Sequence, residues 1–180
     1  TLISVPGHRY ELWLPEAEAV ALLPELLNTG TLGSSNDWIL NEVRAAIPDL
    51  RTATVEAFIP QMTNLQALEG VSFTKGCYTG QEIVTRLQHR GQLKRPMYRL
   101  KARCETLPQA GDPIHSDNKE KVGQVVLAAR NEADECELLA VVIKDQADNS
   151  TLHLETQEGP QLERLELPYT LDPELFEAKR

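Results

Sequence analysis

The residues with the clearest chemical potential form one octapeptide, which reads Lys75-Gly76-Cys77-Tyr78-Thr79-Gly80-Gln81-Glu82. Gly76 and Gly80 permit backbone angles and close approaches that side chains forbid. The positive end of a helix that begins after Gly80, together with Lys75, favours the thiolate form of Cys77. We therefore expect Cys77 to be a reactive thiol, with Lys75 and Tyr78 as its catalytic neighbours. The alternative is a tight loop whose cysteine simply packs inside the protein.

The elements that position this octapeptide are mainly helical. The hydrophobic patterns predict, in chain order, a strand at residues 9–14 and helices at 16–27, 36–46 and 81–89. Ser34 and Ser35 are good N-caps for the second helix, and Gly91 ends the third.

After Gly91 the hydrophobic period becomes that of strands. Runs separated by turn-forming residues lie at 97–104, 122–129, 136–143, 151–156 and 162–167. Short strands at this spacing indicate a small antiparallel β-barrel over residues 93–168, which makes the chain an α+β protein. Residues 1–92 form a separate domain in this interpretation, and residues 169–180 form a polar, loosely held tail.

The net charge of −9 conceals a local excess of positive charge. Between Lys75 and Arg103 the sequence holds eight Lys or Arg residues and one acid, Glu82. An acidic protein with one basic strip is typical of a localised anionic ligand rather than of general nucleic-acid binding. The alternative is a solvated helix face followed by an edge strand rich in Lys and Arg.

The three cysteines are odd in number, widely spaced and without a CxxC pair. This pattern argues against a disulfide framework and against a metal or iron–sulfur site within the chain, and it favours a reducing cytoplasm. Cys104 and Cys136 fall in strand-like runs and are expected to be structural. No apolar run approaches the roughly 20 residues that a membrane span needs, so no membrane contact is expected.

Longer strings give the chain a family resemblance. The strings are Phe58-Ile59-Pro60-Gln61-Met62-Thr63-Asn64-Leu65, the octapeptide with Ile83-Val84, Arg90-Gly91 and Lys94-Arg95. Together they resemble the YgfZ family of folate-binding proteins, which is related to the aminomethyltransferase (T-protein) of the glycine cleavage system. The resemblance extends from Trp38 to Tyr169. Members are about twice as long, so the chain resembles their C-terminal portion, with 1–92 as the end of the T-protein-like folate-binding domain.

The resemblance implies a protein that binds tetrahydrofolate or a one-carbon derivative and supports iron–sulfur enzymes or their assembly factors. Some of those enzymes modify tRNA, which makes tRNA an indirect partner. Trp38 stands where the family has a tryptophan implicated in folate binding. Arg44 replaces the glutamate of aminomethyltransferases, and a guanidinium cannot accept hydrogen bonds from a pterin. Ala46 replaces a common glycine, at little cost if the site is plain helix.

The chemistry of reduced folates gives the same residues roles. A flat pterin and an anionic glutamate tail require aromatic faces, hydrogen-bonding groups and cations. The candidates are Trp38 and Tyr78 for stacking, Gln81 and Glu82 in the first helical turn, and Lys75, Arg86, Arg90, Lys94 and Arg95 for carboxylates. Alternatively, Trp38 is a core anchor and Glu82 pairs with Arg86.

Three functions are compatible with these features. The first is a folate-dependent accessory protein for iron–sulfur enzymes, with Cys77 as its reactive group. The second is a folate-dependent aminomethyl or one-carbon transferase, which Arg44 argues against. The third is a binding module in which Cys77 is inert and the basic strip binds a partner or tRNA.

Overall fold

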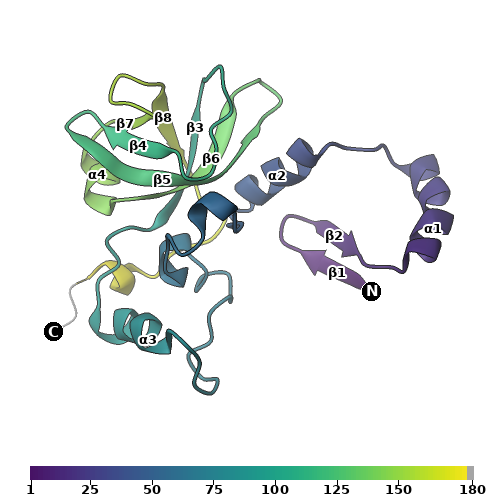
Figure 1. Cartoon of the computed structure of the whole chain (residues 1–180), viewed down its shortest axis with the longest axis horizontal. Helices are drawn as coiled ribbons and strands as arrows, with labels where there is room; N and C mark the ends of the chain where they lie inside the picture. The colour runs from purple at the N-terminus through teal and green to yellow at the C-terminus, as the bar shows by residue number, and fades with distance from the viewer. Residues whose placement is uncertain (178–180) are drawn as a thin grey trace.

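The structure is a computed structural model that describes residues 1–177, and the chain in it comprises an arm, a central segment and a barrel (Figure 1). In the arm, residues 1–33, the strands β1 (Leu2–Val5) and β2 (Arg9–Leu12) pair antiparallel and α1 (Glu16–Thr29) follows. The predicted strand and first helix are confirmed. α1 buries none of its residues and stands away from the barrel (Figure 1).

The helix α2 (Ser35–Arg44) packs on the outside of the barrel. Its N-terminus is a capping box, because the Ser34 hydroxyl accepts from the Asp37 N–H and the Asp37 carboxylate accepts from the Ser34 N–H. Leu40 and Val43 are buried. The sequence pattern predicted this helix and its cap, and both are confirmed.

Ala46 ends α2 in a left-handed conformation, with φ of 52°. Its N–H donates to the Val43 carbonyl, and the Ile47 N–H donates to the Glu42 carbonyl, which together form a Schellman-type ending. The expectation that Ala46 lies in plain helix is therefore wrong. A left-handed residue with a Cβ carries a penalty of about 1–2 kcal/mol, so the glycine common at this position suits the backbone.

The central segment, residues 45–96, contains two 3₁₀ turns and one helix. These are η1 (Thr52–Thr54), η2 (Pro60–Thr63) and α3 (Gln81–Arg90), in that order. α3 agrees with the predicted helix to within one residue, and the Gly91 N–H caps it by donating to the Leu87 carbonyl.

Six antiparallel strands close into a barrel in the order β3-β6-β5-β4-β7-β8. They are β3 (Met97–Ala102), β4 (Pro113–Ser116), β5 (Lys119–Arg130), β6 (Cys136–Val142), β7 (Leu152–Leu154) and β8 (Gln161–Leu165). The small antiparallel barrel is confirmed. Within the barrel region two elements were not predicted: β4, whose four residues begin with a proline, and α4 (Lys144–Asn149), whose polar residues indicated a turn.

Two layers of apolar side chains hold the barrel and α2 together. Side chains such as those of Leu100, Ile114 and Leu138 fill the barrel interior. A second cluster between barrel and helix includes Val43 and Met97. The barrel therefore has a core of its own, and α2 is fixed to its outer surface.

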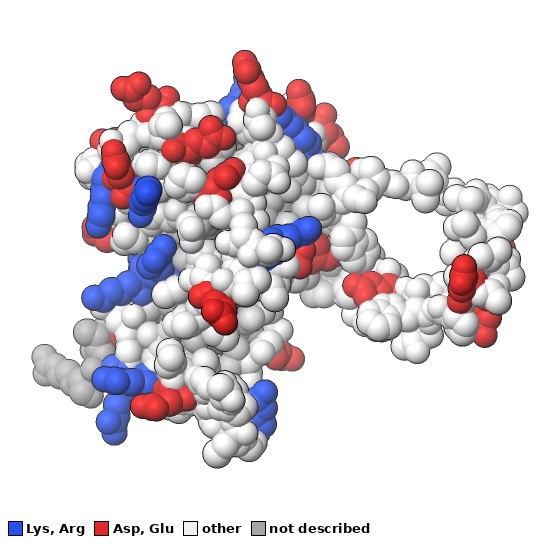
Figure 2. Space-filling view, in the orientation of Figure 1, with Lys and Arg blue, Asp and Glu red and all other residues white. Residues whose placement is uncertain are grey.

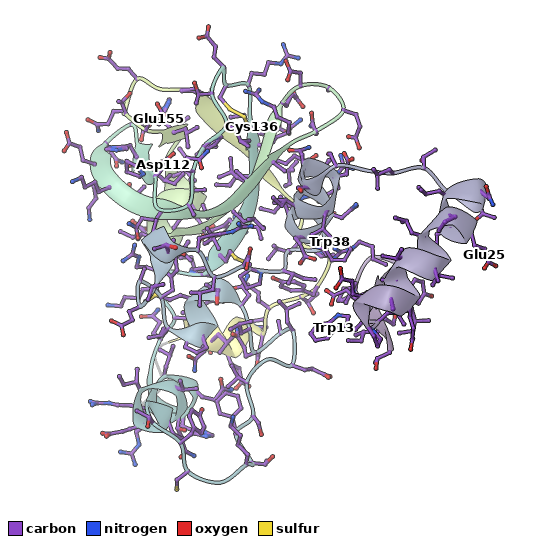
Figure 3. The ribbon with its side chains drawn as sticks, turned by 45° about the vertical axis from the view of Figure 1, so that its right-hand side comes forward. Trp13, Glu25, Trp38, Asp112, Cys136 and Glu155 are labelled. Atoms are coloured by element: carbon purple, nitrogen blue, oxygen red, sulfur yellow. A yellow bond between two sulfur atoms is a disulfide. The ribbon has the colours of Figure 1, made fainter. Side chains whose placement is uncertain are left out.

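A disulfide joins Cys104 to Cys136 at one end of the barrel (Figure 3). The expectation of a chain without disulfides is wrong, although the expectation that these cysteines are structural agrees with the bond. In the β3–β6 ladder Ala102 lies opposite Cys136, so Cys104, two residues further along, reaches the same site. Spacing along the sequence carried no signal of this cross-strand neighbourhood.

The described part of the C-terminal tail is held to the protein. Leu175, in the 3₁₀ turn η3 (Pro173–Phe176), is buried, and its carbonyl accepts from the Leu93 N–H at 2.7 Å. The Gln92 side chain donates to the Phe176 carbonyl at 2.7 Å. A loosely held tail is therefore wrong for residues 169–177, and residues 178–180 lie outside the described part.

A buried carboxylate links α2 to the barrel. Glu137 on β6 is 4% exposed and accepts hydrogen bonds from Arg99 of β3 at 2.7 Å and Arg44 of α2 at 3.1 Å. Burial alone would raise the pKa of Glu137, but the hydrogen bonds from Arg99 and Arg44 outweigh it and hold that pKa below its ordinary value. The ionised carboxylate is thus part of the folded state.

Replacing Glu137 by Gln should lower the free energy of unfolding at pH 7 by about 2 kcal/mol, because two charge-assisted hydrogen bonds are lost. Glu163→Gln, which breaks only the exposed pair with Lys101, should change it by less than about 0.5 kcal/mol. The Glu137 contribution is complete above its ordinary pKa of 4.5 and is lost as the pH falls below it. Urea unfolding at several pH values measures both effects. Equal losses in the two variants would contradict the role of Glu137.

Reducing the disulfide should lower the free energy of unfolding by roughly 2–4 kcal/mol. The reason is that the unfolded chain regains the conformational freedom that the cross-link had removed by closing a loop. Thermal unfolding with and without dithiothreitol measures the effect. In the double variant Cys104→Ser, Cys136→Ser the reductant should have no further effect. A wild-type protein indifferent to reductant would mean that the two sulfurs are not bonded.

Candidate functional site

The octapeptide forms an exposed loop and the first turn of α3. Cys77 is exposed and its thiol is free. The Lys75 ammonium lies 4.4 Å from the centre of the Tyr78 ring, a cation–π contact. The Tyr78 carbonyl accepts from the Gln81 N–H at 3.2 Å, which closes the turn before the helix. The structure therefore places Lys75, Cys77 and Tyr78 in one loop and excludes a cysteine packed inside the protein.

The two glycines of the octapeptide differ in their role. Gly80 is the N-cap of α3 and has φ of 86°, a left-handed conformation that favours glycine. Gly76 shows no left-handed φ, and a Cβ built on it would meet no atom within 4 Å. Within the octapeptide, the backbone therefore requires glycine only at Gly80, while Gly76 leaves open space beside Cys77.

A buried amide fixes α3 to the central segment. Gln61 is fully buried, and its side-chain amide donates to the Val84 carbonyl at 2.7 Å. Val84 is the buried residue of α3. At the other end of the helix, the rings of Phe73 and His89 meet edge to face at 6.4 Å. The helix behind the loop is thus held in place while the loop itself stays open.

The remaining predicted ligand groups lie on α3. Gln81 is half-buried, and Glu82, Arg86 and Arg90 are exposed. Among the described residues no ion pair joins Glu82 to Arg86, so the alternative assignment of Glu82 finds no support. These side chains are open to solvent around the octapeptide.

Trp38 lies on α2, where the hairpin of the arm contacts it. The Arg9 guanidinium stands 4.7 Å from the ring centre, and Arg9 also donates to Glu42 at 2.6 Å. The indole is 38% exposed, so it is not a buried core anchor. Sequence reasoning missed Arg9, because a single arginine in a short strand gives no signal of its partner.

A cavity of about 450 Å³ opens beside Arg9, between the hairpin turn, the end of α2 and Tyr169. Arg44 lines it, but its guanidinium also donates to both Glu132 oxygens, at 2.9 and 2.6 Å, and to Glu137. The Arg44 hydrogen bond holds the pKa of Glu132 down at about 2. Arg44 therefore links α2 to the barrel.

The structure does not bring the two halves of the predicted site together. α2, which carries Trp38, lies against the barrel, whereas α3 and the loop before it lie at the far end of the central segment (Figures 1 and 3). The described contacts of Trp38 involve Arg9, and those of the octapeptide are local. The residue types had suggested one pocket for the Cys77 sulfur and the Trp38 indole, and the described chain does not form such a pocket.

The basic strip is divided in the same way. Its C-terminal part pairs with barrel carboxylates: Arg99 with Glu137, Lys101 with Glu163, and Arg103 with Glu135. Its N-terminal part, on α3 and the loop before it, keeps exposed cations, while red and blue side chains intersperse over the barrel (Figure 2). The excess positive charge thus belongs to the end of the molecule that holds Cys77.

The large exposed apolar side chains of the described residues all lie within residues 1–83. Every large apolar residue that is at least 36% exposed lies before residue 84: Leu2, Ile3, Tyr10, Leu12, Trp13, Val20, Leu23, Leu26, Leu27, Leu32, Trp38, Leu50, Val55, Phe73 and Ile83. The barrel contributes none within the described residues. Ten of these fifteen residues lie in the arm, so the arm holds most of the exposed apolar surface of the described chain.

Among residues 1–177 no helix combines the length and the apolarity that a bilayer crossing requires. The same residues contain no group of three His, Cys, Asp or Glu side chains arranged to hold a metal ion.

Comparison with known proteins identifies relatives of the whole chain. No protein-family model matches it. Three curated relatives are each named tRNA-modifying protein YgfZ. The one from Pectobacterium carotovorum subsp. carotovorum (strain PC1) is 36% identical over 92% of this chain and 51% of its own length. The relative from Serratia proteamaculans (strain 568) is 38% identical over 95% of this chain and 53% of its own length. The relative from Yersinia pestis (strain Pestoides F) is 34% identical over 93% of this chain and 52% of its own length.

The chain thus spans about half the length of the curated relatives that it matches. The similarity runs through the arm, the central segment and the barrel, because it covers more than nine-tenths of the chain. On this similarity, the chain belongs to the YgfZ family.

Proposed function

We propose that this chain is part of a tetrahydrofolate-binding accessory protein that supports the assembly or repair of iron–sulfur enzymes, including enzymes that modify tRNA. The observation that carries the proposal is the state of the three cysteines. Cys104 and Cys136 are joined to each other, whereas Cys77 is free, exposed and flanked by a cation. The relatives' name, tRNA-modifying protein, agrees with this role.

Cys77 supplies one free thiol on an open loop. Iron–sulfur clusters are usually held by four thiolates, so Cys77 cannot hold one alone and must act on a cluster that a partner holds. Lys75 provides positive charge near the sulfur and lies against Tyr78. The space beside Gly76 leaves room for the backbone of a partner to approach the thiol.

Tetrahydrofolate fits the surroundings of Trp38. The indole is 38% exposed and so has surface for stacking with a pterin, and Arg9, which contacts the indole, lines the neighbouring cavity of about 450 Å³. When bound, the folate supplies a carrier for one-carbon units. Tyr78, Gln81, Glu82, Arg86 and Arg90 lie too far away to join Trp38 around one ligand within this chain.

We infer that the two parts of the site meet only in the longer family fold. The curated relatives have about as much chain again as the part matched here. The apolar side chains of the arm and of the loop before α3 mark where such additional chain packs. In that arrangement the additional chain contacts both the Trp38 side of α2 and the loop that holds Cys77.

Aminomethyl transfer is the less favourable assignment. Transferases present a carboxylate to the pterin, and Arg44 stands at that position here. Because Arg44 donates to Glu132 and Glu137, it neither accepts from a pterin nor is free to bind one. A site without that carboxylate can bind folate, but it lacks the group that aminomethyltransferases present to the pterin.

Titration with tetrahydrofolate should quench the tryptophan fluorescence of the wild-type protein in a saturable way. Trp38→Phe should weaken binding about tenfold, because the larger stacking surface is lost. Trp13→Phe is the matched control, since this second tryptophan lies on the arm and contacts Glu11. It should leave the dissociation constant within about twofold of wild type. If Trp38→Phe binds as tightly as Trp13→Phe, the folate assignment at Trp38 is wrong.

Cys77→Ala should abolish the ability of the protein to restore iron–sulfur enzyme activity in cells that lack their own family member. The thiol is exposed and makes no contact that holds the fold, so the free energy of unfolding should change by less than about 0.5 kcal/mol. The control is the double variant Cys104→Ser, Cys136→Ser, which removes the other two sulfurs and should still restore activity. Full rescue by Cys77→Ala would eliminate the thiol role and favour a pure binding module.

A further inference from the structure

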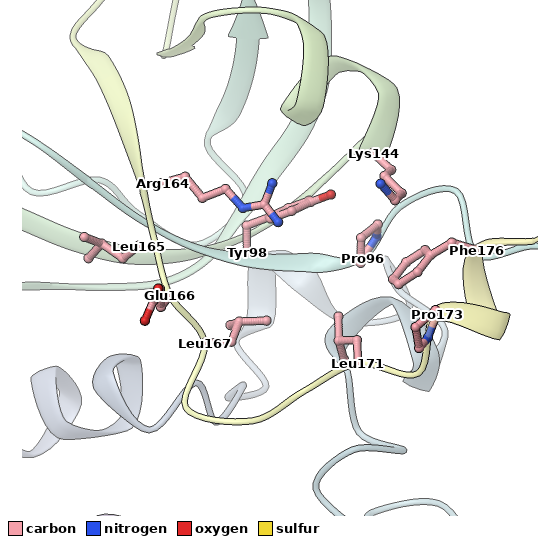
Figure 4. A pocket seen from close by; sticks show the side chains of 10 residues that line it. All are labelled: Pro96, Tyr98, Lys144, Arg164, Leu165, Glu166, Leu167, Leu171, Pro173 and Phe176. Atoms are coloured by element: carbon pink, nitrogen blue, oxygen red, sulfur yellow. The ribbon is translucent and has the colours of Figure 1, made fainter.

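A second cavity, of about 660 Å³, lies on the barrel between β3, β8 and the C-terminal turn η3 (Figure 4). It shares no residue with the octapeptide or with the surroundings of Trp38. Its size is that of sites for small organic ligands. We call this cavity, lined by Tyr98, Lys144, Arg164, Leu171, Pro173 and Phe176 among others, the barrel cleft.

The inner wall of the barrel cleft carries an unsatisfied hydroxyl. Tyr98 is only 4% exposed, yet its hydroxyl makes no hydrogen bond among the described residues and points into the cavity (Figure 4). Burial raises the pKa of Tyr98 to about 12, so the hydroxyl keeps its proton at neutral pH. Since no side chain or backbone group of the described residues bonds this hydroxyl, it is available to a ligand that enters the cavity.

Two cations occupy the upper wall and are held in position. The Arg164 guanidinium lies 4.6 Å from the centre of the Tyr98 ring, and the Lys144 ammonium lies 5.4 Å from the centre of the Phe176 ring. Both also pair with the same carboxylate, that of Asp148. One carboxylate cannot neutralise two cations, so this wall keeps one positive charge.

The opposite wall is apolar. Leu171 and Pro173 lie across the cavity from the cations, and Phe176 lies beside Lys144, with which it makes the cation–π contact (Figure 4). Glu166 also lines the barrel cleft, but it lies at the end away from Lys144 (Figure 4). The cavity thus has a flat apolar side for a ring and a cationic side for an anion, with a hydroxyl donor between them.

We propose that the barrel cleft binds a nucleotide, with its base against the apolar wall and its phosphate at Lys144 and Arg164. Arginine and lysine are the side chains that recognise phosphate, and arginine also stacks on flat rings. The Tyr98 hydroxyl donates to a base or ribose oxygen. This site is separate from the proposed folate and thiol functions. Its ligand is either a free nucleotide or a nucleotide within an RNA strand.

Calorimetric titration of the whole chain with adenosine 5′-monophosphate tests the proposal. We expect saturable binding that weakens as salt is added and that is at least tenfold weaker for adenosine, which lacks the phosphate. Arg164→Ala and Lys144→Ala should each weaken binding about tenfold, and Tyr98→Phe, which keeps the ring, by about threefold. Lys101→Ala is the matched control, a barrel cation outside the cleft, and should bind as wild type.

The source of the ligand is tested with a short 5′-phosphorylated RNA in the same titrations. RNA binding that Arg164→Ala and Lys144→Ala weaken, without binding of the mononucleotide, assigns the cleft to an RNA strand and supports the proposal. Absence of binding by both probes at about 1 mM overturns it. So does equal binding by Arg164→Ala, Lys144→Ala and Lys101→Ala, or displacement of the nucleotide by tetrahydrofolate. Urea unfolding of each variant verifies that a lost signal is not lost folding.

Discussion

The arrangement of the molecule depends on the contact between the Asn64 side chain and the first residue of β3. It is fully buried, and its side chain forms two hydrogen bonds with the backbone of Met97, donating to the carbonyl at 2.9 Å and accepting from the N–H at 3.3 Å. A side-chain amide thus acts as a strand partner where β3 begins. The left-handed backbone of Asn64, with φ of 59°, is tolerated by asparagine better than by most residues. Without this contact the central segment would lose its register on the barrel.

The elements around Asn64 are connected to one another through single polar side chains rather than through a broad apolar core. Tyr169 donates to the Ala46 carbonyl at 2.9 Å, which holds the C-terminal segment to the end of α2. Gln61, three residues before Asn64, holds α3 by its one bond to Val84. Buried amides have few alternative partners, so they specify one arrangement at the cost of desolvation. The loop with Cys77 receives a fixed base in this way, while its own residues stay exposed.

The sequence predicted those parts of the fold that local patterns determine. The capping box at Ser34, the limits of α3 and the antiparallel barrel follow from side-chain chemistry and hydrophobic period. The disulfide, the pairing of Arg44 with Glu137 and the contact of Arg9 with Trp38 join residues more than 25 positions apart. No local pattern records such neighbours. The octapeptide was recognisable because its glycine, cysteine and lysine are adjacent in sequence, whereas the barrel cleft draws its wall from three distant segments.

The division between barrel and arm explains why the candidate site is split. The barrel buries its own apolar side chains, but α1 buries none, and a 14-residue helix gains little stability in water from its own hydrogen bonds. The arm therefore needs a covering surface, and whatever covers it also lies over the Trp38 side of α2, because Arg9 ties the hairpin to that helix. Ile83 on α3 and Phe73 in the segment before it also expose apolar surface. A single body of chain that buries both regions would therefore cover the Trp38 side of α2 and the exposed apolar side chains near α3 together.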